Sequence, residues 1–130
     1  MSTLVAVAAD LTPPPSADAN GPDADPTTAG LTVVEQDDGR IVVHVHGDLD
    51  AVSSPELRLA LIEIVERRPS VLVIDMAGVD FLDSAGISAL VVAHNRGVDA
   101  GVAIELAAVP IGCQRVLEIT SLADIFTIVD

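Results

Sequence analysis

The chain of 130 residues contains no lysine, tyrosine or tryptophan, two phenylalanines and one cysteine, Cys113. A single cysteine excludes an internal disulfide bond and a metal site made of several cysteines, so we interpret Cys113 as a small core residue. So few aromatic rings leave almost nothing on which bases or sugars could stack. The six basic residues, all arginines, stand against 20 acidic residues, and phosphate backbones repel the formal charge of −14. We therefore expect no direct binding to nucleic acid.

Long hydrophobic runs and targeting signals are also missing. No apolar run approaches the roughly 18 residues of a membrane span. No basic residue precedes the mildly apolar stretch Met1–Leu11, as the start of a secretory signal would require. Half of the residues are nevertheless hydrophobic, which is enough for one buried core in a chain of this length. We expect a cytoplasmic protein with no membrane partner.

The first 30 residues differ in composition from the rest. Residues 12–30 hold five of the eight prolines and three aspartates, and they contain no large apolar side chain. Such a stretch cannot bury enough surface to repay the entropy of ordering its backbone. We predict that residues 1–30 form a disordered Pro/Asp-rich tail and that residues 31–130 form the folded domain.

Strands and helices alternate in the predicted domain. Runs of β-branched or alternating apolar residues predict strands at 31–35, 41–46, 71–74, 102–108 and 125–129. Apolar stripes at helical spacing predict helices that begin near Ser54, Ser84 and Ile111. Strands separated by a helix run parallel, through right-handed crossovers. We therefore predict a single α/β domain of order β-β-α-β-α-β-α-β, with a mixed β-sheet and helices mainly on one face.

Two finer predictions concern the middle of the chain. The buried strand at 71–74 is expected to be followed by a loop over Met76–Asp83. The helix from Ser84 to Asp99 is expected to turn one apolar stripe toward the core. That stripe consists of Ile87, Leu90, Val91, His94 and Val98.

The segment Val71–Leu90 carries the clearest functional signal. It predicts a buried strand, a loop, and then Asp83-Ser84-Ala85-Gly86 at the start of a helix. Free backbone N–H groups and the positive end of the helix dipole make such a place favourable for a phosphate, free or covalent. Asp or Ser before a helix also serves commonly as a cap and nothing more. These residues alone leave both interpretations open.

The wider pattern resembles a known family. The strand VLVID, followed by FLDSAG and an apolar helix, is similar to the STAS domain of bacterial anti-sigma factor antagonists. GDLD at Gly47–Asp50 and the C-terminal ITSLADIFTIVD resemble further elements of that family, so the resemblance covers nearly all of Leu31–Asp130. It implies a protein that binds an anti-sigma factor, itself an ATP-dependent serine kinase, and that is switched off when the kinase phosphorylates it.

The resemblance also implies the wider setting of the protein. Such partner switching regulates sigma-factor-dependent transcription, as in a stress response, and a serine phosphatase is the partner that would reverse it. We expect a monomer or a weak dimer. A STAS module that acts as a scaffold, a sensor or a transporter accessory subunit, without a phosphorylation switch, is the alternative.

Ser84 alone matches the phosphorylated serine of the family. Ala85 stands where many members have Ser or Thr, so no neighbouring hydroxyl can substitute for Ser84. The other residues that we assign to the partner-binding loop are Asp83, Ala85, Gly86, Phe81, Asp48 and Asp50.

Each of these residues also has a purely structural interpretation. Asp83 could hold the Ser84 hydroxyl toward an incoming phosphoryl group, or it could cap the helix. Gly86 permits close approach of a backbone, or tight packing between helix and strand.

The same holds for the loop residues around them. Asp48 and Asp50 offer a partner a negative surface, or they are solvated turn acids. Phe81 and Leu82 are expected to anchor the loop in the core, with one of them partly exposed as a contact.

Metal and catalytic chemistry are poorly supported. His44 and His46 share a strand face and could chelate a metal with His94 as a third ligand, but His94 is expected on the opposite side of the sheet. Asp75 ends a buried strand like the aspartate of a phosphoryl receiver, yet the chain has no lysine to stabilise the phosphoryl group. Gly-x-Ser-x-Gly, His-Glu-x-x-His and Walker-type motifs are absent from the sequence. We expect no metal, no cofactor and no enzymatic activity.

Overall fold

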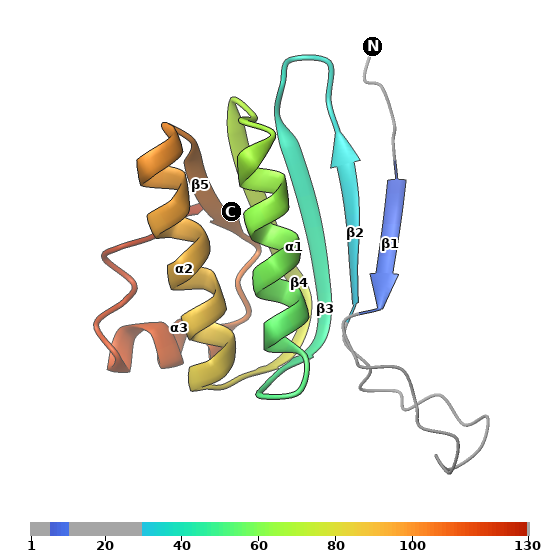
Figure 1. The fold of residues 1–130 in the computed structure, drawn as a ribbon. Coiled ribbons are helices and arrows are strands. Elements are labelled where there is room, and N and C mark those ends of the chain that lie inside the picture. The colour runs from blue at the N-terminus through green and yellow to red at the C-terminus, as the bar shows by residue number, and fades with distance from the viewer. Residues whose placement is uncertain (1–5, 11–29, 130) are drawn as a thin grey trace, which may run out of the picture.

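The computed structural model describes the backbone of residues 6–10 and the backbone and side chains of residues 30–129. Its six-stranded sheet (Figure 1) contains, in spatial order, β1 (Ala6–Asp10), β2 (Gly30–Glu35), β3 (Ile41–Leu49), β4 (Val71–Leu82), β5 (Ala103–Ala107) and β6 (Thr127–Val129). The helices are α1 (Ser54–Glu66), α2 (Ser84–Ala100) and α3 (Ile111–Ile119). The pairs β1–β2 and β2–β3 are antiparallel and the pairs from β3 to β6 are parallel, which confirms the predicted mixed sheet.

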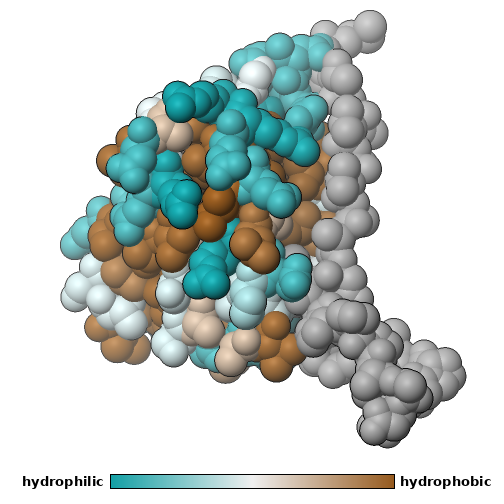
Figure 2. Space-filling model, viewed as in Figure 1, coloured by the Kyte–Doolittle hydropathy of each residue, from teal (hydrophilic) through white to brown (hydrophobic). Residues whose placement is uncertain are grey.

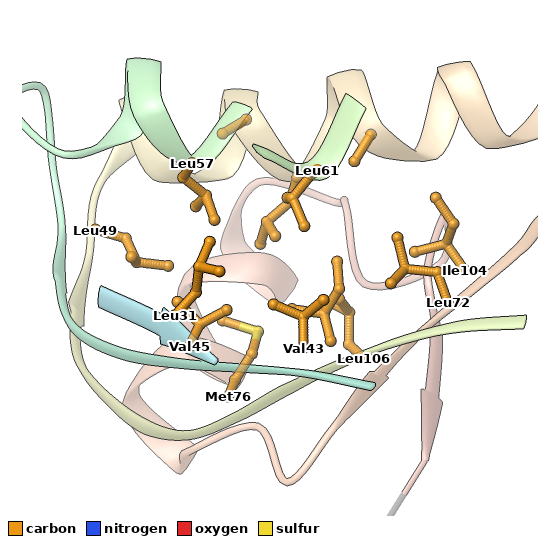
Figure 3. Packing of buried hydrophobic residues seen from close by; sticks show 14 of the residues in the cluster. Leu31, Val43, Val45, Leu49, Leu57, Leu61, Leu72, Met76, Ile104 and Leu106 are labelled. Atoms are coloured by element: carbon orange, nitrogen blue, oxygen red, sulfur yellow. The ribbon is translucent and has the colours of Figure 1, made fainter. Parts of the chain in front are cut away.

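The core lies between the sheet and the two long helices. Val43 and Val45 of β3 are buried, and Ile74 of β4, the register partner of Val43, is buried with them. Leu57 and Leu61 of α1 point down onto this layer (Figure 3). Figure 1 shows α1 and α2 side by side over one face of the sheet, as the sequence predicts. Among the described residues, no helix has the length and apolar content that crossing a membrane requires.

The prediction of a disordered tail is wrong for Ala6–Asp10. These residues form β1, which pairs with β2 from Ala6 opposite Val34 to Asp10 opposite Gly30. Without β1, β2 would be the edge of the sheet, and its outward N–H and C=O groups would lack strand partners. The hydrogen bonds between β1 and β2 are made by the backbone and need no large side chains. The amino-acid composition therefore does not reveal this strand. Residues 1–5 and 11–29 lie outside the described residues, and for them the tail stays a prediction.

Both central strands are longer than predicted. β3 continues past His46 to Leu49, and β4 continues past Ile74 to Leu82 through most of the segment expected to be a loop. The register shifts between His44 and His46 and again between Gly47 and Asp48. Each shift inserts one extra residue into β4, so the two-residue alternation that marks a strand in a sequence is broken in β4, although the backbone pairing goes on. In β3 the alternation of burial continues to Leu49. The ends of β3 and β4 therefore stay side by side as far as the start of the helices.

The face of α2 that meets the core is rotated from the predicted stripe. Ile87 and Leu90 are buried as expected, but Val98 is 66% exposed. The buried face also contains Gly86, Ala89, Ala93 and Gly97. A Cβ on Gly97 would lie 2.7 Å from Cδ1 of Ile104 and 2.8 Å from the carbonyl oxygen of Val102. Small residues thus let α2 approach the sheet closely, and a search for large apolar residues overlooks them.

We predict that Gly97→Ala destabilises the protein by about 1–3 kcal/mol, because the new methyl group overlaps the side chain of Ile104 and the backbone of Val102. Gly112→Ala is the matched control, since a Cβ there meets nothing within 4 Å and alanine favours a helix. Thermal melting should therefore show a lowered midpoint for Gly97→Ala and an unchanged or raised one for Gly112→Ala. Equal midpoints for the two variants would contradict this packing.

Candidate functional site

The starts of α1 and α2 meet at one end of the sheet. Because β3, β4 and β5 are parallel, the segments that follow them emerge at the same edge. Leu49 at the end of β3 pairs with Leu82 at the end of β4. The backbone N–H of Asp83 then donates to the carbonyl oxygen of Leu49 at 3.2 Å. This bond fixes the first turn of α2 against the end of β3.

Asp83 is the N-cap of α2. Its Oδ1 accepts hydrogen bonds from the backbone N–H groups of Ala85 at 2.8 Å and Gly86 at 3.2 Å. The carbonyl oxygen of Asp83 accepts from the N–H of Ile87 at 2.9 Å. The carboxylate thus satisfies two of the donors that a helix start leaves free. Of the two interpretations of Asp83, this geometry supports the cap.

Gly86 is required by the close approach of α2 to β3. A Cβ at this position would lie 2.6 Å from the carbonyl oxygen of Leu49 and 2.7 Å from Cδ1 of Leu82. One of these atoms is backbone, so the chain could not yield without moving a strand or the helix. The absence of a Cβ at Gly86 therefore allows the short distance between the start of α2 and the sheet.

Ser84 stands on this fixed turn as the first residue of α2, and it is exposed. Ala85 beside it is partly buried and carries no hydroxyl group. The Ser84 hydroxyl is therefore accessible in the folded domain, at a helix N-terminus, which is a favourable place for a phosphate.

The turn after β3 uses its aspartates mainly for its own structure. Oδ1 of Asp50 accepts from the N–H groups of Val52 at 3.0 Å and Ser53 at 3.1 Å. The hydroxyl of Ser53 donates to the carbonyl oxygen of Asp48 at 2.7 Å. Asp48 and Asp50 are both partly buried. The structure therefore supports the turn interpretation for Asp50, while both carboxylates still lie near the start of α1.

Of Phe81 and Leu82, one is expected in the core and the other partly exposed as a contact for a partner. Leu82 is buried, and Phe81 is 50% exposed. Phe81 lines a shallow groove of about 270 Å³ between the end of β4 and the start of α3, which Pro110 and Val116 also line. Ile111, the first residue of α3, is 69% exposed. The sequence predicts this helix, but none of its residues is among the predicted site residues. Because α3 follows the parallel strand β5, its start lies at this same edge.

A second groove, of about 190 Å³, lies between the first turns of α1 and α2. Arg58 of α1 and Ala85 and Ser88 of α2 line it, together with Ser54. Figure 2 shows brown, pale and a few teal side chains mixed in the lower part of the view, where the two helices begin, and most of the teal side chains toward the top. Neither Arg58 nor Ser88 carries a motif that the sequence analysis could detect. The packing of α1 beside α2 brings them to one groove, which Ala85, the chain neighbour of Ser84, also lines.

The remaining candidates lie elsewhere. Nδ1 of His44 contacts Oδ2 of Asp75 at 2.9 Å on the sheet face opposite the helices, and His46 is exposed. His94 instead packs its ring edge against Phe126. Among residues 30–129, no three His, Cys, Asp or Glu side chains are grouped as a metal would need. That finding brings no support for the zinc alternative, and the absence of a metal stays a prediction.

Cys113 is buried at the start of α3, as expected for a core residue. Desolvation by burial raises the pKa of its thiol. The thiol therefore stays protonated at neutral pH, and it is a poor nucleophile.

Comparison with known proteins gives a consistent result. The family model described as the STAS domain matches residues 32–130. Over 65 residues the chain is 34% identical to the anti-sigma-F factor antagonist RsfB of Mycobacterium tuberculosis, a match that covers 50% of this chain and 52% of RsfB. The chain thus spans about half the length of this relative.

Solved structures extend the likeness over more of the chain. The crystal structure of an anti-sigma factor antagonist from Mycobacterium paratuberculosis matches with a TM-score of 0.67 at 30% identity, and the match covers 81% of this chain and 88% of that one. The anti-sigma factor antagonist SpoIIAA in its unphosphorylated form matches with a TM-score of 0.66 at 12% identity, covering 77% of this chain and 88% of that one. At 12% identity the likeness to SpoIIAA concerns the fold alone.

We predict that Asp83→Ala lowers the free energy of unfolding by about 1 kcal/mol, because two N–H groups at the start of α2 lose their acceptor. For a domain of this size, that loss lowers the melting midpoint by roughly 4–8 °C. Asp80→Ala, at an exposed position near the end of β4, is the control and should melt close to the parent protein. A midpoint for Asp83→Ala that matches this control would show that the cap contributes nothing.

Proposed function

Because the chain belongs to the STAS domain family, we propose that it is an anti-sigma factor antagonist. In this proposal it is a binding protein without catalytic residues, which holds an anti-sigma factor while Ser84 is unmodified and releases it when Ser84 is phosphorylated. The observation that carries the proposal is an exposed serine on the first turn of α2, which the Asp83 cap and the Gly86 contact hold in place. RsfB and the Mycobacterium paratuberculosis protein, both antagonists by name, support the same role.

The surface around Ser84 suits a protein partner. Phe81 lines the groove at the start of α3 and is half-exposed, and Ile111, which follows the groove residue Pro110 in the chain, also exposes a large apolar side chain. Exposed apolar side chains that border a groove are typical of the centre of a protein–protein interface. We call this surface, made of Asp80, Phe81, Ser84 and Ile111, the Ser84 face. Asp80 gives it a negative charge, so we expect the anti-sigma factor to meet it with a basic and apolar surface.

Phosphorylation would change this surface without changing the fold. It adds a charge of roughly −1.5 to −2 at neutral pH. At a helix N-terminus that charge is favourable, so α2 should stay intact. The same charge would be buried beneath a bound partner, where desolvation is costly unless a cation faces it. We therefore expect release to result from the cost of burying the phosphate in the interface.

The proposal also specifies the other participants. The anti-sigma factor is the serine kinase that uses ATP to modify Ser84, and a serine phosphatase restores the unmodified antagonist. Because this cycle consumes ATP and controls a sigma factor, we place the chain in the cytoplasm. While the antagonist binds the anti-sigma factor, the sigma factor is free, and the free sigma factor directs transcription.

We predict that Ser84→Ala binds the anti-sigma factor with the affinity of the parent and is not phosphorylated, because Ala85 provides no second hydroxyl. Ser84→Asp should bind at least about tenfold more weakly, a loss of roughly 1.4 kcal/mol, while its melting midpoint stays within about 2 °C of the parent. Calorimetric titration and thermal melting of the three proteins provide the comparison. Unfolding of Ser84→Asp, or phosphate on Ser84→Ala, would contradict the proposed switch.

A second prediction concerns Phe81. Phe81→Ser should weaken binding to the anti-sigma factor by about tenfold or more, because aromatic side chains commonly dominate the energy of such interfaces. Val98→Ser is the control, since Val98 is 66% exposed on α2 but lies about 21 Å along the helix from Ser84. Its affinity should equal that of the parent. If the two variants bind equally well, the Ser84 face is not the docking surface.

A further inference from the structure

Arg58 is the charged side chain that lines the groove between α1 and α2. It lies one turn into α1, across from Ala85 and Ser88 of α2, and it is exposed. Side chains on a helix lean toward its N-terminus, so Arg58 leans toward the end of the sheet where Ser84 stands. Ser84 borders the groove because it precedes Ala85 directly and lies one helical turn before Ser88.

Arg58 has no partner of its own within the described part of the chain. Arg67, by contrast, donates to Oε1 of Glu35 at 2.8 Å, and Arg68 donates to the carbonyl oxygen of Ala100 at 3.5 Å. The guanidinium of Arg58 is therefore available to an anion that arrives in the groove.

Ser54 provides a second and independent observation. This first residue of α1 lines the same groove, is 5% exposed, and has a buried hydroxyl without a hydrogen-bond partner in residues 30–129. Buried hydroxyl groups almost always have a partner. The groove thus contains an unsatisfied donor beside an unpaired guanidinium, and both suit phosphoryl oxygens.

We propose that this groove receives the phosphoryl group of phosphorylated Ser84, with Arg58 as its counter-ion and Ser54 as a hydrogen-bond donor. The inference rests on the proposed function in that it concerns the modification of the same serine. In the modification, Oγ of Ser84 bonds to the γ-phosphorus of a nucleoside triphosphate, and the bond from that phosphorus to the β-phosphate oxygen breaks to release the diphosphate. The proton of the hydroxyl group passes to water. Arg58 can then bind two phosphoryl oxygens with its forked N–H groups.

The acidic residues around the site show why a counter-ion matters. Asp83 lies next to Ser84 in the chain, Glu56 stands on the first turn of α1, and Asp80 precedes α2. Asp48 and Asp50 precede the start of α1 in the chain. All five carboxylates raise the second pKa of a phosphate on Ser84, whereas the helix dipole and Arg58 lower it. Arg58 is the positively charged side chain among these groups, and a substitution can remove it without altering the Asp83 cap of α2.

The test inserts phosphoserine at position 84 during translation, so no kinase is needed. A phosphorus NMR titration then measures the second pKa of the phosphate. We expect Arg58→Gln to raise that pKa by about half a unit, as the loss of a partly exposed ion pair would. Arg58→Lys should restore most of the difference, and Ser54→Ala should raise the pKa by a smaller amount.

Arg96→Gln is the matched control. It removes the same charge from α2 about 18 Å along the helix from Ser84, beyond the Debye length at physiological ionic strength, and should leave the pKa unchanged. Raising the salt from about 0.1 M to about 1 M should shrink the difference between the parent and Arg58→Gln.

Equal pKa values for the parent and Arg58→Gln would overturn the inference, and so would equal shifts in Arg58→Gln and Arg96→Gln. Should Arg58→Gln fail to fold, the salt dependence of the parent and of Arg58→Lys decides. If the phosphate pKa in both proteins does not change between low and high salt, the inference is overturned. Failure of the proposed function gives a different result. The anti-sigma factor would then not bind the unmodified chain, whatever the titration shows.

Discussion

The contact between Gly86 and the backbone of Leu49 determines how the functional end of this molecule is built. With no Cβ at Gly86, the first turn of α2 rests against the end of β3, where a methyl group would lie 2.6 Å from the carbonyl oxygen of Leu49. That carbonyl also accepts the N–H of Asp83, and the Asp83 carboxylate then caps α2. The position of Ser84 therefore follows from strand pairing, a glycine contact and a cap rather than from a flexible loop. A rigid support lets a modification on Ser84 alter the surface while the fold stays the same.

Two grooves lie near the start of α2, and they differ in chemistry. The groove at the start of α3, with Phe81 on its wall, offers apolar surface to a partner protein. The groove between α1 and α2, with Arg58, offers a positive charge to a phosphate. In the chain, Ser84 lies between Leu82, which lines the first groove, and Ala85, which lines the second. A phosphate drawn from Ser84 toward Arg58 would therefore stay close to the surface proposed for the partner. Because the chain has 20 acidic and only six basic residues, few other positive charges can offset a phosphate, and Arg58 lines this groove.

The sequence predicts what depends on neighbouring residues and misses what depends on contacts across the fold. Asp83-Ser84 marks a helix start because caps act within one turn, and the stripe of Leu57 and Leu61 marks a buried helix face because its period is local. β1 depends instead on the free edge of β2, which composition does not reveal. The continuation of β4 to Leu82 depends on bulged pairing with β3. The groove between α1 and α2, to which Arg58 contributes, depends on how the two helices pack, and neither helix shows this alone.

The central claim is that phosphorylation of Ser84 changes a surface on an unchanged domain. Amide NMR spectra of the unmodified chain and of the chain with phosphoserine at position 84 test it most directly, together with hydrogen exchange of the core amides. The account predicts shift changes confined to residues 47–58 and 80–89, with the exchange protection of Val43 and Ile74 unaltered. Loss of protection in these core strands, or shift changes spread over the whole sheet, would contradict it.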